Sequence, residues 1–332
     1  MSRTTTDPER EDETAGSVGS TSNVVAMFDD FVSRVAPQIP LPGRGATWER
    51  FTTLAQWSAQ DLSVGRLCEG HSDAIAILCE AGMKPQAECS YGVWAARSAT
   101  GPTYATKVAG GWQLSGAKAF CSGSRLIERA LVTAESESGY LLFDISTKDQ
   151  VVGVQPGSWP TVGMAASQSE TLEFGGPPVP EDRVVGPADF YLQRPGFWFG
   201  AVGVAACWYG GARGVVEDLT QGLKPEMSDV TLASLGEAVA TLEVMRVVLS
   251  YAAAQIDGDP LNQSGQAKFL ALVARRAVHD GAQAVLSAAA SAGGARPFTL
   301  DERQSRRAAD LFIYLTQHHG ASDAVELGRL AG

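Results

Sequence analysis

The feature that most constrains the fold is a change of hydrophobic pattern along the chain, from helical to strand-like and back to helical. From Thr47 to about Gly82 the pattern predicts helix, and Ser72 and Asp73 could begin a second short helix. The apolar anchors of this first region are Phe51, Leu54, Leu62, Ile75 and Leu78.

The pattern of the middle region, from Tyr91 to about Val185, is typical of strands. Short apolar or alternating runs such as "YGVWAA", "RALVTAES" and "GYLLFDIS" are interrupted by Gly, Pro and Ser. The stretch "AGGWQLSG" has a Gly-Gly turn between two such runs, which indicates a hairpin. We therefore expect an antiparallel β-domain, a small barrel or sandwich.

From Gly196 onward the pattern is helical again. One long helix is predicted by apolar residues at intervals of three and four: Leu235, Val239, Leu242, Met245, Leu249, Ala252 and Ile256. A second runs from about Ser264 to Ala292 and stops at Gly293 and Gly294, which can cap a helix.

A last helix is expected to run toward His318, because Thr299 and Glu302 have the spacing of a capping box. The fold class is thus α+β, with the order α, β, α and a helical bundle at the end. We expect four regions: a disordered tail over 1–22, a short helical domain over 23–90, a β-domain over 91–190, and a domain like a four-helix bundle over 191–332.

Composition excludes several classes of function. The formal net charge is −11 and no Lys/Arg run appears, so nucleic acid and anionic membranes are not expected partners. No apolar stretch approaches the roughly 20 residues of a membrane helix, and the first 22 residues lack the apolar core of a signal peptide. The five cysteines form no CxxC pair, which favours free thiols in the cytoplasm and no metal site.

Two stretches carry a resemblance to a known family. "GGWQLSGAKAFCSGSRLIERALVTA" resembles the strand–turn–strand segment of the acyl-CoA dehydrogenase family, and "TVGMAASQSETLEFGGPPVPEDRVVG" resembles a later segment of the same family. Both occur in order within an α–β–α chain, and the match covers roughly residues 47 to 330. "DLSVGRLCEGHSDAIAIL" also resembles the end of the family's first helical domain.

The resemblance implies an FAD-dependent oxidoreductase that oxidises the CH–CH group of an acyl thioester. In the family a carboxylate removes the α-proton while the β-hydride passes to the flavin, and the electrons leave to an acceptor protein or oxygen. The resemblance places Phe120, Cys121 and Ser122 along the flavin ring, with Ser122 near its reactive nitrogen; an ordinary strand end is the alternative. It also implies a homo-oligomer, in which Gly293 and Gly294 approach a neighbour's flavin or simply cap their helix.

The chain departs from the family in ways that bear on cofactor and chemistry. Ala96 stands where a threonine hydroxyl would meet the flavin, so only backbone contacts from Ala95 and Ala96 remain there, and Pro102 replaces a serine. The Arg-x-x-Phe-Gly element that holds the flavin diphosphate is absent from "QGLKPEMSDVTLASLGEA". The first helical domain is short.

The catalytic glutamate is also missing. Neither "FIYLTQHHG" nor "FWFGAVGVAACW", its two usual locations, contains a carboxylate, and His318 or His319 stands where the base would be. The pair could be metal ligands, a polar helix end, or a base or substrate donor. As a base, His319 ranks ahead of His318 because it precedes Gly320, and Asp323 could orient whichever histidine acts.

Three functions follow from this pattern. The first is a dehydrogenase acting on an unusual acyl thioester or carrier-bound acyl group. The second keeps the flavin but is a monooxygenase, which needs no carboxylate base. The third is a binding or assembly subunit without flavin. Of the other polar residues, we expect His71 and His279 to be structural and Arg303, Arg306 and Arg307 to form a solvated face.

Overall fold

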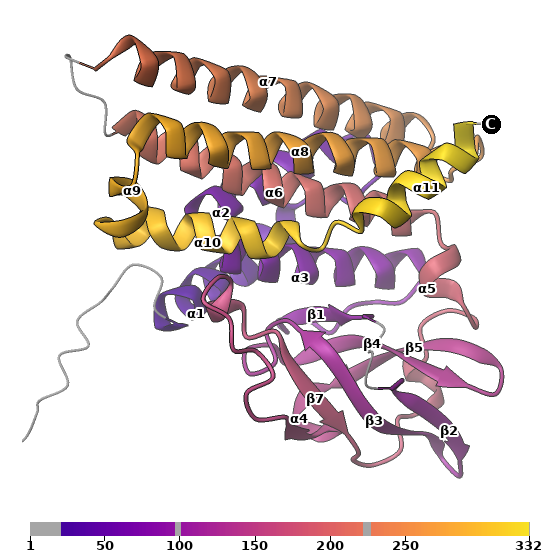
Figure 1. Ribbon diagram of the computed structural model, residues 1–332. Coiled ribbons are helices and arrows are strands. Elements are labelled where there is room, and N and C mark those ends of the chain that lie inside the picture. The colour runs from indigo at the N-terminus through magenta and orange to yellow at the C-terminus, as the bar shows by residue number, and fades with distance from the viewer. Residues whose placement is uncertain (1–20, 97–100, 222–226, 332) are drawn as a thin grey trace, which may run out of the picture.

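The computed structural model describes residues 21–96, 101–221 and 227–331, and confirms an α+β fold with helices on both sides of the β-region in sequence. A helical half and a β-half lie against each other, with α3 (Leu62–Glu80) along their boundary (Figure 1). The expected tail lies outside the described residues up to residue 20, but its last two residues already belong to α1 (Thr21–Asp30).

The first helical region is interrupted at Asp61, between two helices, and this break was not predicted from the sequence. The Asp61 carboxylate accepts hydrogen bonds from the backbone N–H groups of Ser63 and Val64, so it caps α3 after α2 (Thr47–Gln60) has ended. The prediction of a second helix at Ser72 and Asp73 was therefore wrong, because both residues lie inside α3. The remaining N-terminal elements are a π-helical turn over Phe31–Val35 and a 3₁₀ turn over Ala36–Gln38.

The β-half is one curled seven-stranded sheet. Its order is β1-β4-β2-β3-β7-β6, and β5 pairs with the β4 strand. Most pairs are antiparallel as expected, but β1 pairs in parallel with β4, and so does β2 through a single pair of residues. The strands are β1 (Tyr91–Trp94), β2 (Tyr104–Val108), β3 (Gly111–Cys121), β4 (Arg129–Ser136), β5 (Gly139–Ser146), β6 (Val151–Val154) and β7 (Glu170–Phe174).

The hairpin expected at the Gly-Gly turn is confirmed. Gly110 and Gly111 have φ of +88° and +148° and join β2 to β3 in antiparallel register. Short helical turns complete the region: α4 (Thr147–Gln150), Ala165–Ser167, Glu181–Arg183 and α5 (Phe190–Gln193).

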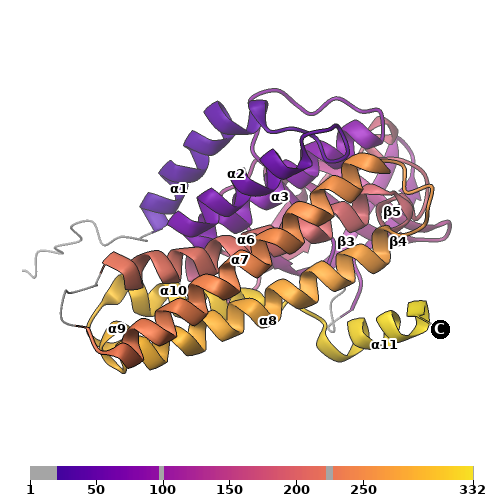
Figure 2. The same ribbon diagram turned by 90° about the horizontal axis from the view of Figure 1, so that it is seen from above.

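The second helical region packs around α6 (Gly196–Gln221). From above, α7 (Asp229–Gly258) and α8 (Ala267–Gly293) lie over α6 (Figure 2). Close approach depends on glycine: a Cβ on Gly210 of α6 would lie 2.3 Å from the Ala55 carbonyl oxygen of α2. The expected apolar stripe of α7 is buried only in its second half, at Met245, Leu249, Ala252 and Ile256.

The C-terminal elements differ from expectation at both ends of α10 (Glu302–Leu315). The α8 helix ends at Gly293, with Gly294 at φ +60°, and the short α9 (Arg296–Thr299) follows. Asp301, and not Thr299, caps α10 by accepting a hydrogen bond from the Gln304 N–H. A turn then carries His318 and His319, and a further helix, α11 (Gly320–Ala331), begins directly after them.

No helix in the described ranges is long and apolar enough to cross a membrane. All five cysteines are free thiols.

Candidate functional site

The end of β3 presents an aromatic ring to the surface. The β3–β7 register shifts between Lys118 and Cys121, and Phe120 adopts a left-handed backbone (φ +60°) that leaves it 59% exposed. The neighbouring Cys121 points the other way and is fully buried, and burial raises the pKa of its thiol to about 12. The Phe120 side chain is thus accessible to a ligand, whereas the Cys121 thiol lies in the core and is unreactive.

The residues after β1 lie beside this strand end. The Trp94 indole N–H donates to the Ser122 carbonyl oxygen (3.0 Å), and the Lys118 ammonium donates to the Ala96 carbonyl oxygen (3.4 Å) and the Thr133 hydroxyl (3.2 Å). Burial lowers the pKa of Lys118 to about 8. The structure therefore brings Ala95 and Ala96 to the same place as Phe120, Cys121 and Ser122.

A loop over residues 155–169 packs against the end of β3, beside Phe120. The Trp159 ring meets Phe120 edge-on at 6.3 Å between centroids, and its indole N–H donates to the Met164 carbonyl oxygen (3.0 Å). Within the loop, Ser167 and Ser169 connect to the Ser122 hydroxyl through hydrogen bonds of 2.8 Å each. The resemblance to the family covers this loop only from Thr161 onward, and neither Trp159 nor either serine was predicted from the sequence.

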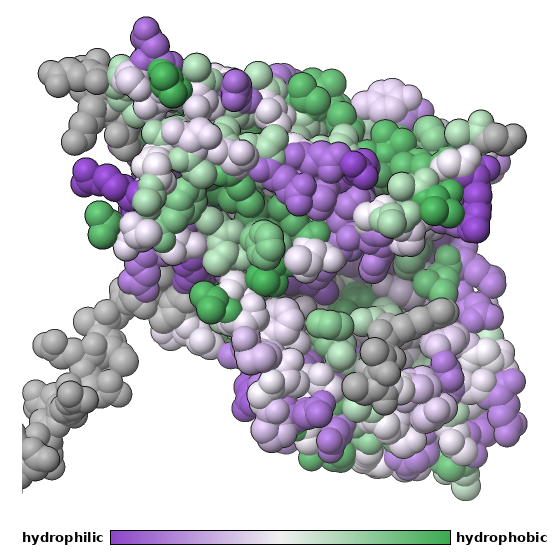
Figure 3. All heavy atoms as spheres, in the orientation of Figure 1, coloured by the Kyte–Doolittle hydropathy of each residue, from purple (hydrophilic) through white to green (hydrophobic). Residues whose placement is uncertain are grey.

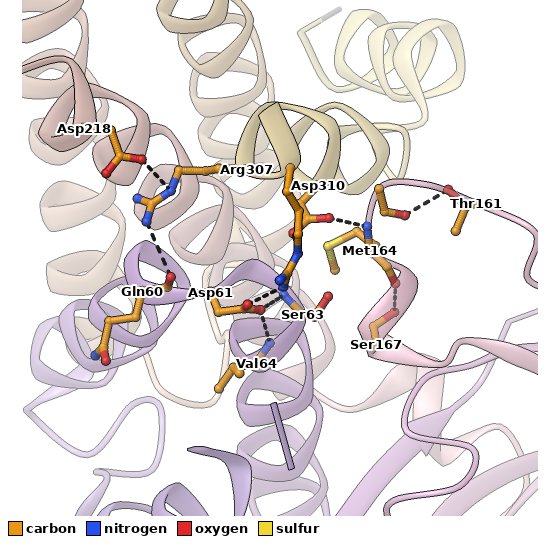
Figure 4. Close-up of polar contacts among 12 residues, drawn as sticks. Gln60, Asp61, Ser63, Val64, Thr161, Met164, Ser167, Asp218, Arg307 and Asp310 are labelled. Atoms are coloured by element: carbon orange, nitrogen blue, oxygen red, sulfur yellow. Dashed lines mark hydrogen bonds and ion pairs between the residues drawn. The ribbon is translucent and has the colours of Figure 1, made fainter. Parts of the chain in front are cut away.

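The loop is held to the helical half by α10 (Figure 4). The Asp310 carboxylate accepts a 2.5 Å hydrogen bond from the Met164 backbone N–H, and Arg306 lies 3.5 Å from Asp310 and 2.5 Å from Asp61. The prediction that Arg306 and Arg307 belong to a solvated face was wrong. Arg307 is buried and forms a 3.1 Å ion pair with the Asp218 carboxylate of α6.

Asp310 is a carboxylate held in an unfavourable environment. Burial raises its pKa to about 6, against the opposing effects of the Met164 N–H and Arg306. The Asp310 carboxylate nevertheless contacts both the Met164 N–H and the Arg306 guanidinium. Through these contacts it connects the C-terminal helices to the loop beside Phe120.

His318 and His319 point into different surroundings. The His318 side chain is 2% exposed, and its ring lies 4.4 Å from the His279 ring and 6.3 Å from the Trp208 ring. Burial, reinforced by His279, lowers the pKa of His318, so the ring is neutral at pH 7. His319 is exposed. Whether either residue acts in catalysis stays a prediction.

The region around His318 contains buried polar atoms without partners. The His318 Nδ1 atom lies 3.3 Å from an Asp323 oxygen but is too poorly aligned for a hydrogen bond, and Nε2 has no partner in the described structure. The same holds for the indole nitrogen of Trp208, and the Tyr314 hydroxyl has only the weak thiol of Cys207 beside it. Unpaired buried polar atoms are rare in native proteins and mark places that a ligand can satisfy.

Gly293 and Gly294 lie apart from these groups, at the end of α8 beside α9 (Figure 1). Gly293 contributes to a small cavity of about 130 Å³ between α6, α7, α8 and α10. A Cβ there would lie 2.3 Å from Pro297, so close packing accounts for this glycine without a ligand. Contact with a neighbour's flavin stays a prediction.

The surface is hollowed between the helical half and the β-half (Figure 3). The residues present fit a flavin at this boundary. An exposed aromatic ring at Phe120 can cover a ring face, the Ala95–Ala96 backbone offers peptide groups, and the Ser122 hydroxyl is available to a ring nitrogen. In the described ranges, no group of three or more His, Cys, Asp or Glu side chains could hold a metal ion.

Comparison with known proteins identifies the fold. Neither family models nor curated protein sequences match the chain. Among solved structures, the chain is similar to TdsC from Paenibacillus sp. A11-2 in complex with FMN and indole, at 19% identity over 93% of this chain and 94% of that one (TM-score 0.73). TdsC is also described as a dibenzothiophene monooxygenase.

Two further solved structures agree. Methanesulfinate monooxygenase MsuC from Pseudomonas fluorescens is 18% identical over 94% of this chain and 96% of that one (TM-score 0.70). KijD3 in complex with FMN and a dTDP-linked amino-keto sugar is 17% identical over 92% and 91% (TM-score 0.71). The chain therefore has the fold of the acyl-CoA dehydrogenase-like flavin enzymes.

Proposed function

We propose that the protein is a flavin-dependent monooxygenase that acts on a small molecule with oxygen. The observation that carries the proposal is the buried, neutral His318, with an unpartnered ring nitrogen, in place of a free carboxylate. A neutral imidazole can accept or donate one proton during oxygen chemistry, whereas abstraction of a thioester α-proton requires a positioned base of sufficient strength.

Three carboxylates of the same interior already have partners. Glu69 pairs with Arg66, and Asp73 lies 3.6 Å from Arg194. Asp310 accepts from the Met164 N–H. Each of the three thus already has an oxygen facing an arginine or a backbone N–H, which supports the monooxygenase over the dehydrogenase.

For the cofactor we propose FMN in place of the FAD expected from the sequence. The Arg-x-x-Phe-Gly element that holds the diphosphate of FAD in the resembled family is absent from this chain, and FMN has no diphosphate. TdsC and KijD3 were both solved with FMN. When bound, the flavin would supply the electrons that activate oxygen; Phe120, Ser122 and the Ala95–Ala96 backbone would hold its ring.

We also propose that the chain forms a homo-oligomer through the outer face of α7. This face exposes several large apolar side chains that a monomer would leave in water: Val230, Leu232, Val239, Val244, Val247 and Tyr251. A second copy would bury them in a symmetric contact. Light scattering at micromolar concentration tests this proposal, and a monomer would contradict it.

Two reactions of the flavin-loaded protein test the activity. Acyl-CoA thioesters of several chain lengths, added without oxygen, should not bleach the visible absorbance of the bound flavin. Reduced FMN, isotopically labelled oxygen and a panel of aromatic, organosulfur and amino-sugar compounds should give a product that carries the label. Anaerobic bleaching by a thioester would instead establish a dehydrogenase.

A further inference from the structure

Three serine hydroxyls form a continuous chain from the end of β3 into the 155–169 loop. The Ser122 Oγ lies 2.8 Å from the Ser169 Oγ, which lies 2.8 Å from the Ser167 Oγ, which in turn lies 2.8 Å from the Met164 carbonyl oxygen. All three serines are buried, at 8%, 6% and 0% exposure respectively. Each hydroxyl has one proton to donate, so the protons in this chain can be assigned.

The serine hydroxyls can donate in only one direction as long as the last hydrogen bond, from Ser167 to the Met164 carbonyl, is kept. A carbonyl oxygen can only accept, so Ser167 donates its single proton to Met164. Ser169 must then donate to Ser167, and Ser122 must donate to Ser169. The Ser122 hydroxyl therefore has no proton left and can offer only lone pairs to a ligand.

The end of the chain is fixed in place. The Met164 carbonyl also accepts from the Trp159 indole N–H, and the Met164 N–H is held by Asp310 of α10. Reversal would turn the Ser167 proton toward Ser169 and would cost the hydrogen bond to the Met164 carbonyl. The helical half thus sets, through four residues, which way the Ser122 proton points.

Resting on the proposed function, we propose that Ser169 and Ser167 are positioning residues that make the flavin site select reduced over oxidised FMN. The reactive ring nitrogen carries a proton in reduced flavin and is a bare acceptor in oxidised flavin. A Ser122 hydroxyl that can only accept complements the first and faces the second with lone pair against lone pair. Selection of the reduced form would let the protein take electrons already carried by FMN and leave the spent, oxidised form free to dissociate.

The test compares the dissociation constants of oxidised and reduced FMN, measured anaerobically by fluorescence and absorbance titration. The wild-type protein should bind reduced FMN the more tightly. In Ser169→Ala, Ser122 regains a free proton, and the ratio of the two constants should fall about tenfold, the size of one hydrogen-bond preference. Ser167→Ala, which frees Ser169 to turn, should lower the ratio in the same direction by less.

The matched control is Ser124→Ala. The Ser124 hydroxyl also bonds the loop, at the Gln168 carbonyl oxygen (2.8 Å), but lies outside the chain, so the ratio should not change. A merely structural role for Ser169 would weaken both forms equally, and this result would overturn the inference. Equal binding of both forms by the wild type would overturn it while leaving the proposed function intact. Failure to bind either form would overturn both.

Discussion

Two regions of the molecule differ in how far their buried polar groups are paired. Around Met164, the Asp310 carboxylate, the Arg306 guanidinium and the serine hydroxyls have partners at hydrogen-bond or ion-pair distance. Around Trp208, the indole nitrogen and the His318 Nε2 have none among the described residues. Since a folded chain normally satisfies buried polar groups, the paired groups of the first region stabilise the fold, and the unpaired groups of the second are the ones that we propose to contact a substrate.

The largest expected effect separates the two histidines of the second region. His318→Ala should lower the rate of the oxygen-dependent reaction by roughly 10²–10⁴ while FMN still binds, because the ring that faces the interior is lost. His319→Ala, the matched control, should change the rate little, since this side chain is exposed. We thus predict the opposite order from the ranking based on sequence.

The pH profile gives a second measurement of the same assignment. Because the pKa of His318 is lowered from 6.5, the rate should rise with pH through a limb that lies below this ordinary value, and His318→Ala should remove the limb. Equal, small losses of rate in His318→Ala and His319→Ala would mean that the two histidines are only polar residues at a helix end.

The next largest effect concerns the ion pairs and hydrogen bonds around Met164. Arg306→Ala would leave the buried carboxylates of Asp61 and Asp310 without their shared cation, and should lower the free energy of unfolding by about 3–5 kcal/mol. Arg276→Ala removes an exposed guanidinium, 52% exposed and paired with Asp280, and should cost less than about 0.5 kcal/mol. Urea denaturation checks both. Similar midpoints for the two variants would mean that the network around Met164 carries little energy.

A smaller effect follows from the raised pKa of Asp310. Between its ordinary value of 3.8 and about 6, the folded protein holds a proton that the unfolded chain has released, so this group's contribution to stability declines as pH rises through that window. Over about pH 4 to pH 7 the decline amounts to at most about 3 kcal/mol. Asp310→Asn has no such proton, and its unfolding free energy should decline less over the same range. If the unfolding free energies of the wild type and Asp310→Asn declined equally with pH, the raised pKa of Asp310 would be contradicted.

Much of the fold could be predicted because it rests on local patterns. The Gly110–Gly111 hairpin and the stop of α8 at Gly293 depend on glycine positions that a sequence displays directly. The break at Asp61 was missed because one N-cap residue looks like any other aspartate until the backbone on both sides is known. The parallel pairing of β1 with β4 was missed because a parallel neighbour lies far along the chain.

The site could be predicted only in part, for the same reason. Phe120 and Ser122 stand in one recognisable segment, so the resemblance selected them together. Trp159 and Asp310 lie in segments that meet Phe120 and Met164 only in the folded chain. The sequence predicts Arg306 at the surface because a charged run on an amphipathic helix usually faces water, whereas its pairing with Asp61 spans most of the sequence.

The most direct test of the account is an anaerobic titration of reduced FMN, followed by absorbance and fluorescence, with three proteins: the wild type, Phe120→Ala and Phe312→Ala. Phe120 and Phe312 are both exposed, at 59% and 62%, but only Phe120 stands at the proposed flavin edge. We predict saturable binding of one FMN per chain to the wild type, a loss of affinity of about tenfold in Phe120→Ala, and no change in Phe312→Ala. A wild-type protein that does not bind reduced FMN, or a Phe120→Ala variant that binds it as well as the wild type, would contradict the placement of a flavin at the end of β3.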